Sequence, residues 1–332
     1  MKTPGLPEIS DWTIRNRWIW SLVGVLILWA LLSAVTSQLS LSSLSGVAIS
    51  SSFLALVALG QMAVVTTGDG NIDLSIASVM TLSAYVALIV IGGHDGRLVL
   101  GVVVTFGLGL FVGAINAALV LLARIPAIIA TLATGYVLAT ASLLANRAIP
   151  GFTIAPTLRA IATARVVGVP IMAVVAVVVV IVASLVLNRT AYGRTLSAVG
   201  QNALAARLAG VRTIRVAAGA FLASSVLAAF TGLLLGAYVG GAFLEMGQPF
   251  LLQSLGAVVL GGTLIFGGSA TAVGTMFGAV LLVLIVTTMQ IARLPPGTQD
   301  VVEGAVIIAV LALAGGTTLR RRSKLPIAAT AK

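Results

Sequence analysis

The chain has 332 residues, of which 59% are hydrophobic and only 8% are charged, with a net charge of +11 and no cysteine. So few charged side chains cannot cover the water-facing surface of a soluble domain of this length, and without cysteine no disulfide framework exists. Long, continuously apolar runs fit membrane-crossing helices and lack the alternating pattern of a β-barrel. The composition therefore predicts an all-α polytopic membrane protein.

In chain order, the apolar runs predict about ten transmembrane helices. Their expected ranges are 18–35, 45–67, 72–91, 98–122, 126–145, 168–187, 216–237, 250–266, 270–292 and 301–316. The first run is expected to be an uncleaved anchor, because nine further runs follow it. Three regions result: a cytoplasmic N-terminal segment (1–17), a transmembrane domain (18–316) and a basic cytoplasmic tail (317–332).

The basic residues predict the orientation of these spans. With ten spans and the N-terminus inside, only five of the 19 lysines and arginines fall outside, and these are Arg97, Arg147, Arg159, Arg165 and Arg293. Cytoplasmic segments of membrane proteins are enriched in Lys and Arg. Both termini are therefore expected to be cytoplasmic, and topology explains the positive charge better than binding of nucleic acid does.

A polar segment, VVTTGDGNIDLSIAS (residues 64–78), separates the second and third spans. A carboxylate at membrane depth is costly, so Asp69 and Asp73 must face protein, water or the interface. In one interpretation Asp73 or Asn71 caps the third span, with help from Ser75. In the other, the break lies inside the bundle and lines a translocation pathway, together with polar residues of neighbouring spans. The candidate pathway residues are Gln61, Asn71, Asp73, Ser75 and Asn116.

The longest cytoplasmic loop, residues 188–215, is rich in arginine and has no acidic residue. Its centre predicts a short helix over 203–209, with Asn202 as N-cap and Gly210 at the left-handed end position. Leu204, Leu208 and Val211 form an apolar stripe at i, i+4 and i+7. Two helical turns are not stable alone in water, so the stripe needs lipid headgroups or a cytoplasmic partner to lie against.

Three motifs in this order resemble the permeases of sugar-type (ribose/monosaccharide class) bacterial ABC importers, within the branched-chain amino acid/sugar permease superfamily. They are NIDLSIAS (71–78), YGRTLSAVGQNALAARLAGV (192–211) and AVVLGGTLIFGGSATAVGTMFGA (257–279). The matched loop residues, with the apolar stripe, give the expected ATPase-coupling set: Gly193, Arg194, Ala198, Gly200, Asn202, Ala206, Leu208, Gly210 and Val211. Close helix packing is expected at the glycines of the last motif, which are Gly261, Gly262, Gly267, Gly268, Gly274 and Gly278.

The resemblance implies a membrane-spanning permease subunit, not an enzyme, that imports a monosaccharide or a similar small polar solute across the bacterial inner membrane. The implied partners are ABC ATPase subunits at residues 188–215, a periplasmic solute-binding protein, and a second permease copy or a homologous permease. The chain has no phosphate-binding loop of its own, so ATP hydrolysis is expected elsewhere. No cofactor or metal is expected, since His94 beside Asp95 has no further ligand nearby.

Two other functions remain open from the residues alone. A branched-chain amino acid ABC permease shares the layout, but a zwitterion would need charged or helix-end partners in its path. A secondary transporter would need ionisable residues inside the spans, which are essentially free of them. The chain departs from the sugar-type pattern around residues 69–71 and at Leu252 and Gln253, where an acidic pair is usual. A faint echo between residues 113–126 and 278–295 would fit an inverted repeat.

Overall fold

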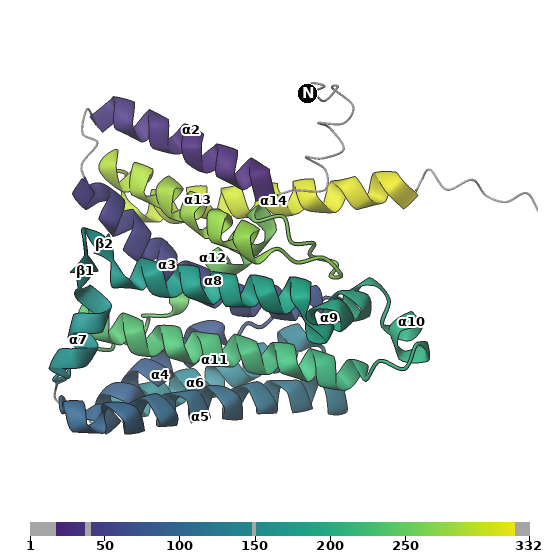
Figure 1. Ribbon diagram of the computed structural model, residues 1–332, viewed down its shortest axis with the longest axis horizontal. Coiled ribbons are helices and arrows are strands. Elements are labelled where there is room, and N and C mark those ends of the chain that lie inside the picture. Colours follow the sequence, from purple (N-terminus) through teal and green to yellow (C-terminus); the bar gives the residue numbers. More distant parts are fainter. Residues whose placement is uncertain (1–17, 37–40, 148–150, 323–332) are drawn as a thin grey trace, which may run out of the picture.

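The computed structural model describes residues 18–36, 41–147 and 151–322. The longer helices are α2 (Trp18–Thr36), α3 (Leu41–Thr66), α4 (Ile76–Ile91), α5 (Leu98–Ala117), α6 (Ala127–Arg147), α8 (Ile171–Arg189), α11 (Thr213–Val239), α12 (Gln248–Leu260), α13 (Ala272–Ile291) and α14 (Pro296–Arg322). The shorter elements are η1 (Asp95–Arg97), the π turn η2 (Ala118–Leu122), α7 (Pro156–Thr163), α9 (Ala191–Gln201), α10 (Ala203–Leu208) and the antiparallel strands β1 (Arg165–Val166) and β2 (Val169–Pro170). The long helices run side by side along one direction (Figure 1).

The predicted all-α membrane architecture is confirmed, with one correction to its spans. Among the described residues, six helices are long and apolar enough to cross a membrane: Leu44–Thr66, Asp95–Leu122, Ala127–Arg147, Ile171–Arg189, Thr213–Val239 and Ala272–Ile291. Three further apolar helices are shorter, and the count of about ten spans stays a prediction. The ranges 72–91 and 250–266 were too long, because α4 has 16 residues and α12 has 13, or roughly 24 and 20 Å of helix.

The domain boundaries stay predictions. The predicted N-terminal segment, residues 1–17, and residues 323–332 of the predicted tail lie outside the described residues. The proposed start of the tail at residue 317 falls inside α14, which continues to Arg322. The helix therefore extends into the basic run instead of ending before it.

The core of the bundle surrounds α4, which is buried along most of its length. A helix that is apolar on all sides is expected to lie in the interior. Glycines allow its neighbours to approach closely: a Cβ at Gly232 of α11 would lie 2.1 Å from the Met80 carbonyl oxygen. A Cβ at Gly247, just before α12, would lie 2.0 Å from the Ala77 carbonyl oxygen. Backbone-to-backbone packing thus holds α4 between α11 and α12.

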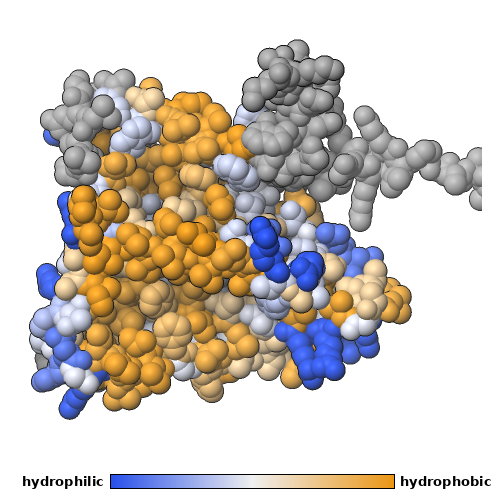
Figure 2. All heavy atoms as spheres, in the orientation of Figure 1, coloured by the Kyte–Doolittle hydropathy of each residue, from blue (hydrophilic) through white to orange (hydrophobic). Residues whose placement is uncertain are grey.

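The outer surface of the bundle has an apolar middle and two hydrophilic ends. The visible face shows an orange belt over α8, α11 and α5, with blue residues gathered at both ends (Figure 2). Large apolar side chains are exposed there, among them Phe111 and Val178. In water such a belt would be unfavourable, whereas lipid tails cover it without cost.

The two ends of the bundle differ in their elements. One end carries α7, β1 and β2, and the other carries α9 and α10 (Figure 1). α2 begins and α14 ends at the α9–α10 end. The start of α2, the end of α14 and the long basic loop thus share one end of the bundle, and the side of the membrane that this end faces stays a prediction.

The sequence echo has a local structural counterpart. Ala-Arg-Ile-Pro follows η2, and Ala-Arg-Leu-Pro follows α13. In both turns the arginine takes a left-handed conformation, with φ 57° at Arg124 and 55° at Arg293, and a helix begins directly after the proline. A non-glycine residue rarely adopts positive φ, so the same strained turn in both places supports a repeated unit.

Candidate functional site

The polar segment between α3 and α4 is a non-helical break inside the bundle. α3 ends at Thr66 and α4 begins at Ile76. Gly68, Asp69 and Gly70 all have positive φ, which turns the chain sharply. Asp69 is exposed at this turn, whereas Asp73 is fully buried. The two aspartates therefore have different surroundings, although they are only four residues apart.

The carboxylate of Asp73 is held by hydrogen bonds to both of its oxygens. Its Oδ1 accepts from the Ser75 backbone N–H at 3.0 Å and from the Ser75 hydroxyl at 2.6 Å. Its Oδ2 accepts from the hydroxyl of Ser224, on α11, at 2.8 Å. A buried carboxylate needs such partners, and bonds to a charged acceptor are stronger than neutral ones. Asp73 thereby ties the start of α4 to α11.

Further polar side chains extend this contact to α5 and α6. The amide of Asn116, on α5, donates to the Ser75 hydroxyl at 2.8 Å. Thr131, on α6, accepts from the Leu74 backbone N–H at 2.9 Å. The break is thus bonded to α5, α6 and α11, and we call Asp73, Ser75, Asn116, Thr131 and Ser224 the polar lock.

The structure brings three of the five predicted pathway residues together and leaves two apart. Asp73, Ser75 and Asn116 belong to the polar lock. Asn71 is half-buried and donates to the Thr67 hydroxyl, so it does not cap α4. Gln61 is buried in α3, and its Oε1 has no hydrogen-bond partner among the described residues. Asp73 does not cap α4 either, because it accepts the N–H of Ser75, which is itself the N-cap residue, and no side chain of the described residues bonds the first free N–H groups of the helix. A contact of these residues with solute stays a prediction.

The loop 188–215 folds into two helices, of which only the second was predicted. Thr190 caps α9 by accepting from the Gly193 N–H at 3.2 Å. α9 then buries Leu196 and Val199 against α3, α5 and α11. The Tyr192 hydroxyl donates to the Val216 carbonyl at 3.1 Å, and burial raises the pKa of Tyr192 to about 12, so the phenol stays neutral. α9 is therefore part of the bundle.

α10, by contrast, projects from the bundle. It forms where the sequence predicts it, with the Asn202 side chain accepting from the Ala205 N–H at 2.9 Å and Gly210 in a left-handed conformation. Ala206 faces the bundle, but Leu204 and Leu208 are 69% and 82% exposed. Two large apolar side chains thus face outward on a short helix within the arginine-rich loop.

Glycines join α9 to α3 and to the loop between α12 and α13. A Cβ at Gly200, near the end of α9, would lie 1.9 Å from the Thr66 carbonyl oxygen and 2.4 Å from the Gly268 nitrogen. The Gly268 N–H donates to that Thr66 oxygen at 3.0 Å, and Gln201 donates to the Gly268 carbonyl at 3.2 Å. We call these contacts of Thr66, Gly200, Gln201 and Gly268 the glycine junction.

The glycines predicted to pack helices fall into two groups. Gly261, Gly274 and Gly278 lie where α12 meets α13, and a Cβ at Gly278 would lie 2.2 Å from the Ala257 carbonyl oxygen. Gly262, Gly267 and Gly268 instead lie in the loop between α12 and α13, all with positive φ. They shape the loop, and Gly267 and Gly268 bring it to the glycine junction, because glycine adopts positive φ without strain.

Other members of the predicted coupling set have local roles in the two helices. A Cβ at Gly193 would lie 2.1 Å from the Leu187 carbonyl oxygen, so this glycine permits the turn from α8 into α9. Arg194 is exposed, and Ala198 and Val211 pack at the margin of the cluster under α9. Contact of any of them with an ATPase stays a prediction.

Sequence reasoning missed Ser224, Thr131 and the helix α9. Ser224 is one of many small residues in an apolar run, and 151 positions separate it from Asp73, so no local signal marks it. α9 did carry a signal: Thr190 is a favourable N-cap, and Tyr192, Leu196 and Val199 follow at helical spacing.

Comparison with known proteins gives consistent matches over nearly the whole chain. The family described as "Branched-chain amino acid transport system / permease component" matches residues 43–311. The chain is 32% identical to the autoinducer 2 import system permease protein LsrC of Enterobacter sp. (strain 638), over 91% of this chain and 88% of that protein. It is also 32% identical to the probable ABC transporter permease protein y4mJ of Sinorhizobium fredii (strain NBRC 101917 / NGR234), over 86% of each. No solved structure matches the chain.

Proposed function

The chain belongs to the branched-chain amino acid transport system permease family, and on that basis we propose that it is the membrane-spanning subunit of a bacterial ABC importer for a small polar solute. Similarity to LsrC, named for import of autoinducer 2, favours a sugar-like solute over a branched-chain amino acid. The protein is then a transporter subunit of the inner membrane and not an enzyme. Separate ATPase subunits drive it, and a solute-binding protein delivers the cargo.

The observation that carries this proposal is the exposed pair Leu204 and Leu208 on α10. Their exposed fractions of 69% and 82% are unfavourable in water, and the flanking arginines keep the element at a polar surface. An apolar helix face that fits a hydrophobic groove is a common recognition element. We infer that α10 inserts into a groove of an ATPase subunit, with the α10 end of the bundle in the cytoplasm.

The glycine junction supplies a route from that contact to the membrane. α9 is anchored by its buried face, and its end packs against the last turn of α3 at Gly200 and is hydrogen bonded to the α12–α13 loop through Gln201. The polar lock begins seven residues after Thr66. A displacement of α9 and α10 by the ATPase would therefore reach the break between α3 and α4 through backbone contacts, which cannot give way as flexible side chains do.

The sidedness and the assembly follow from the same proposal. Of the five arginines predicted outside, Arg97 and Arg147 end η1 and α6, Arg165 begins β1, Arg293 follows α13, and Arg159 lies within α7. The end of the bundle that carries α7 and β1 would face the periplasm and receive the binding protein. A second permease copy or a homologous permease would complete the pathway between two subunits, as the family resemblance implies.

A site-specific cross-link tests the proposal. The photoreactive residue p-benzoylphenylalanine replaces Leu208, or Val167 as a control, in the full-length chain in its native membrane. Val167 is also apolar and is 97% exposed, but it lies in the β1–β2 turn at the opposite end. We expect the residue-208 probe to capture a protein that azido-ATP labels, and the residue-167 probe to capture none.

Two results would contradict the proposal. One is an equal yield of the nucleotide-labelled product from both positions. The other is solute uptake that continues when Leu204→Arg abolishes the cross-link from the residue-208 probe, since that would make the chain an independent transporter.

A further inference from the structure

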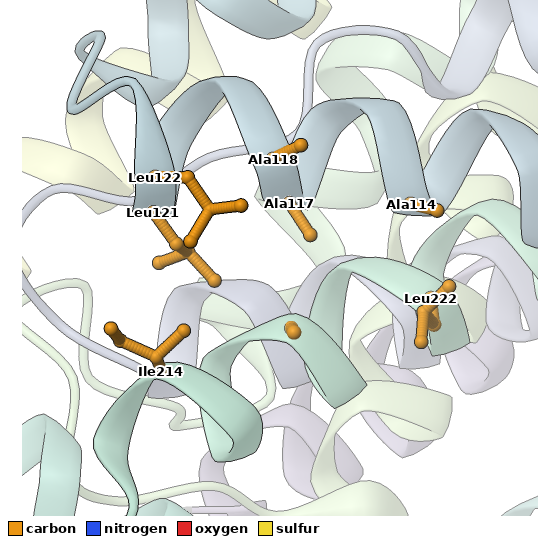
Figure 3. Close-up of a pocket in the computed structure, with 8 residues that line it drawn as sticks. Ala114, Ala117, Ala118, Leu121, Leu122, Ile214 and Leu222 are labelled. Carbon is orange, nitrogen blue, oxygen red and sulfur yellow. The ribbon is translucent and has the colours of Figure 1, made fainter.

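An apolar groove between α5–η2 and α11 lies apart from the polar lock and the glycine junction. It is lined by Ala114, Ala117, Ala118, Leu121, Leu122, Ile214, Ala218 and Leu222, and its volume is about 220 Å³. In Figure 3, Leu121 and Leu122 extend toward Ile214 across the groove, while Ala114 and Leu222 mark its other end. Ala114, Ala118 and Leu122 are exposed, so the groove opens to the surface. Because every lining residue is apolar, it suits a hydrocarbon chain and not a polar solute.

Backbone contacts and a π turn give the groove its shape. A Cβ at Gly113 would lie 2.8 Å from the Leu222 Cα, so α5 and α11 touch directly at that level. Beyond it, the alanines of α5 leave a gap. There η2 widens the helix, and the Ala123 N–H donates to the Ala118 carbonyl at 3.0 Å. Single π turns occur often at functional sites.

Three arginines lie within three residues, along the chain, of lining residues of the groove. Arg215 precedes Ala218 and Leu222 by three and seven residues, so it shares their face of α11. Arg124 follows the groove residue Leu122 by two positions, and Arg212 precedes Ile214 by two. All three arginines are exposed. The chain has no aspartate or glutamate between Asp95 and Glu245, so no acidic residue of that long stretch neutralises them.

We propose that the groove binds one anionic phospholipid, with an acyl chain between α5–η2 and α11 and the phosphate at Arg124, Arg212 and Arg215. Basic pockets between transmembrane helices on the cytoplasmic side take anionic headgroups, and the guanidinium fork matches phosphate oxygens. That the bound lipid belongs to the inner leaflet rests on the proposed function, whereas the existence of the lipid site does not. Arg212 and Arg215 lie at the start of α11, which follows α10 in the chain. The lipid would therefore lie beside α10.

Native mass spectrometry of the full-length chain tests the site. The protein, purified in detergent, is titrated with palmitoyl-oleoyl phosphatidylglycerol or with phosphatidylcholine of the same chains. We expect retention of one phosphatidylglycerol in preference to phosphatidylcholine. Arg124→Gln and Arg215→Gln should each weaken phosphatidylglycerol retention by about fivefold and leave phosphatidylcholine unchanged. Ala118→Trp, which fills the groove, should lower retention of both lipids.

Matched variants separate the groove from the general surface. Arg165→Gln removes an exposed arginine at the opposite end, and Gly107→Trp adds the same ring to α5 where a Cβ meets nothing within 4 Å. Both should behave as wild type.

Equal retention of the two lipids by the wild-type chain would overturn the proposal, as would full retention by both arginine variants. So would efficient disulfide formation between two copies of Ala118→Cys in membranes, because the groove would then be an interface between permeases. Lipid retention is measured without ATPase or cargo. A negative result would therefore contradict the lipid site and leave the proposed transport function untouched.

Discussion

The break at residues 67–75 and the loop at 188–215 are both polar interruptions of an apolar chain, yet they are opposite in character. In the break, a charged side chain is buried and both of its oxygens are hydrogen bonded within the chain. In the loop, apolar side chains are exposed with nothing from the described residues over them. Each segment thus places side chains where they would be costly unless they had a partner.

The difference shows which segment finds its partners within the described chain. The polar lock finds its partners on α5, α6 and α11 of the same chain, so its first role is to hold the break in place. The leucines of α10 are largely exposed among the described residues, and our proposal assigns their partner to another molecule. Polarity alone does not distinguish the two segments. What distinguishes them is whether their side chains find hydrogen-bonding or packing partners within the same subunit.

The largest effect is expected where the two segments meet. Gly200→Ala places a Cβ 1.9 Å from the Thr66 oxygen, and the backbone on both sides must shift. We expect a loss of about 3 kcal/mol of folding stability, measured by thermal unfolding in detergent, together with ATP hydrolysis uncoupled from uptake. Gly107→Ala, which meets open space, is the control and should change neither. Normal coupling in Gly200→Ala would remove the glycine junction from the mechanism.

The next effect tests the polar lock directly. Asp73→Asn replaces one acceptor oxygen by a donor amide, which would face a serine hydroxyl or the Ser75 N–H. We expect destabilisation of about 2 kcal/mol in thermal unfolding. Asp69→Asn makes the same chemical change four residues earlier at an exposed position, and it should stay within about 0.5 kcal/mol. Equal effects of the two variants would show that burial does not distinguish these aspartates.

Neighbouring serines of α11 offer a finer test. Ser224 donates to Asp73, whereas the buried Ser225 hydroxyl has no hydrogen-bond partner among the described residues. Ser224→Ala should therefore cost about 1 kcal/mol of stability, and Ser225→Ala should be neutral or slightly stabilising. The same unfolding assay compares them, and the reverse order would contradict the hydrogen bonds of the polar lock.

The smallest effect concerns the shape of α10. Asn202→Ala removes the N-cap bond to Ala205 and should cost about 0.5 to 1 kcal/mol locally. We expect faster tryptic cleavage at Arg207 with the bundle intact. Asn202→Asp keeps an acceptor oxygen and should restore the wild-type rate. Unchanged cleavage in both variants would mean that a cap does not maintain α10.

Sequence reasoning predicted elements that depend on local chemistry. The N-cap at Asn202, the helix that follows it and the left-handed Gly210 depend on adjacent residues, and all three form as expected. The prediction failed where the length of a helix had to be inferred from a run of apolar residues alone. Ile72 and Leu74 are apolar, but they belong to the break, because Asp73 and Ser75 bond to other helices and not to a continuing helix. Likewise residues 261–266 were predicted to continue a span, but they lie in the loop between α12 and α13, which Gly267 and Gly268 turn toward α9.

By itself the sequence determined that this is a helical membrane protein, where its polar interruptions lie and which motifs it shares with ABC importer permeases. Apolar length, charge placement and helix caps act over a few residues, so they can be read along the chain. Only the tertiary structure decided that Asp73 reaches Ser224, that Gly200 touches Thr66 and that the leucines of α10 remain uncovered. Those facts depend on which helices come together, and contact between distant segments leaves no periodic signal in a single sequence.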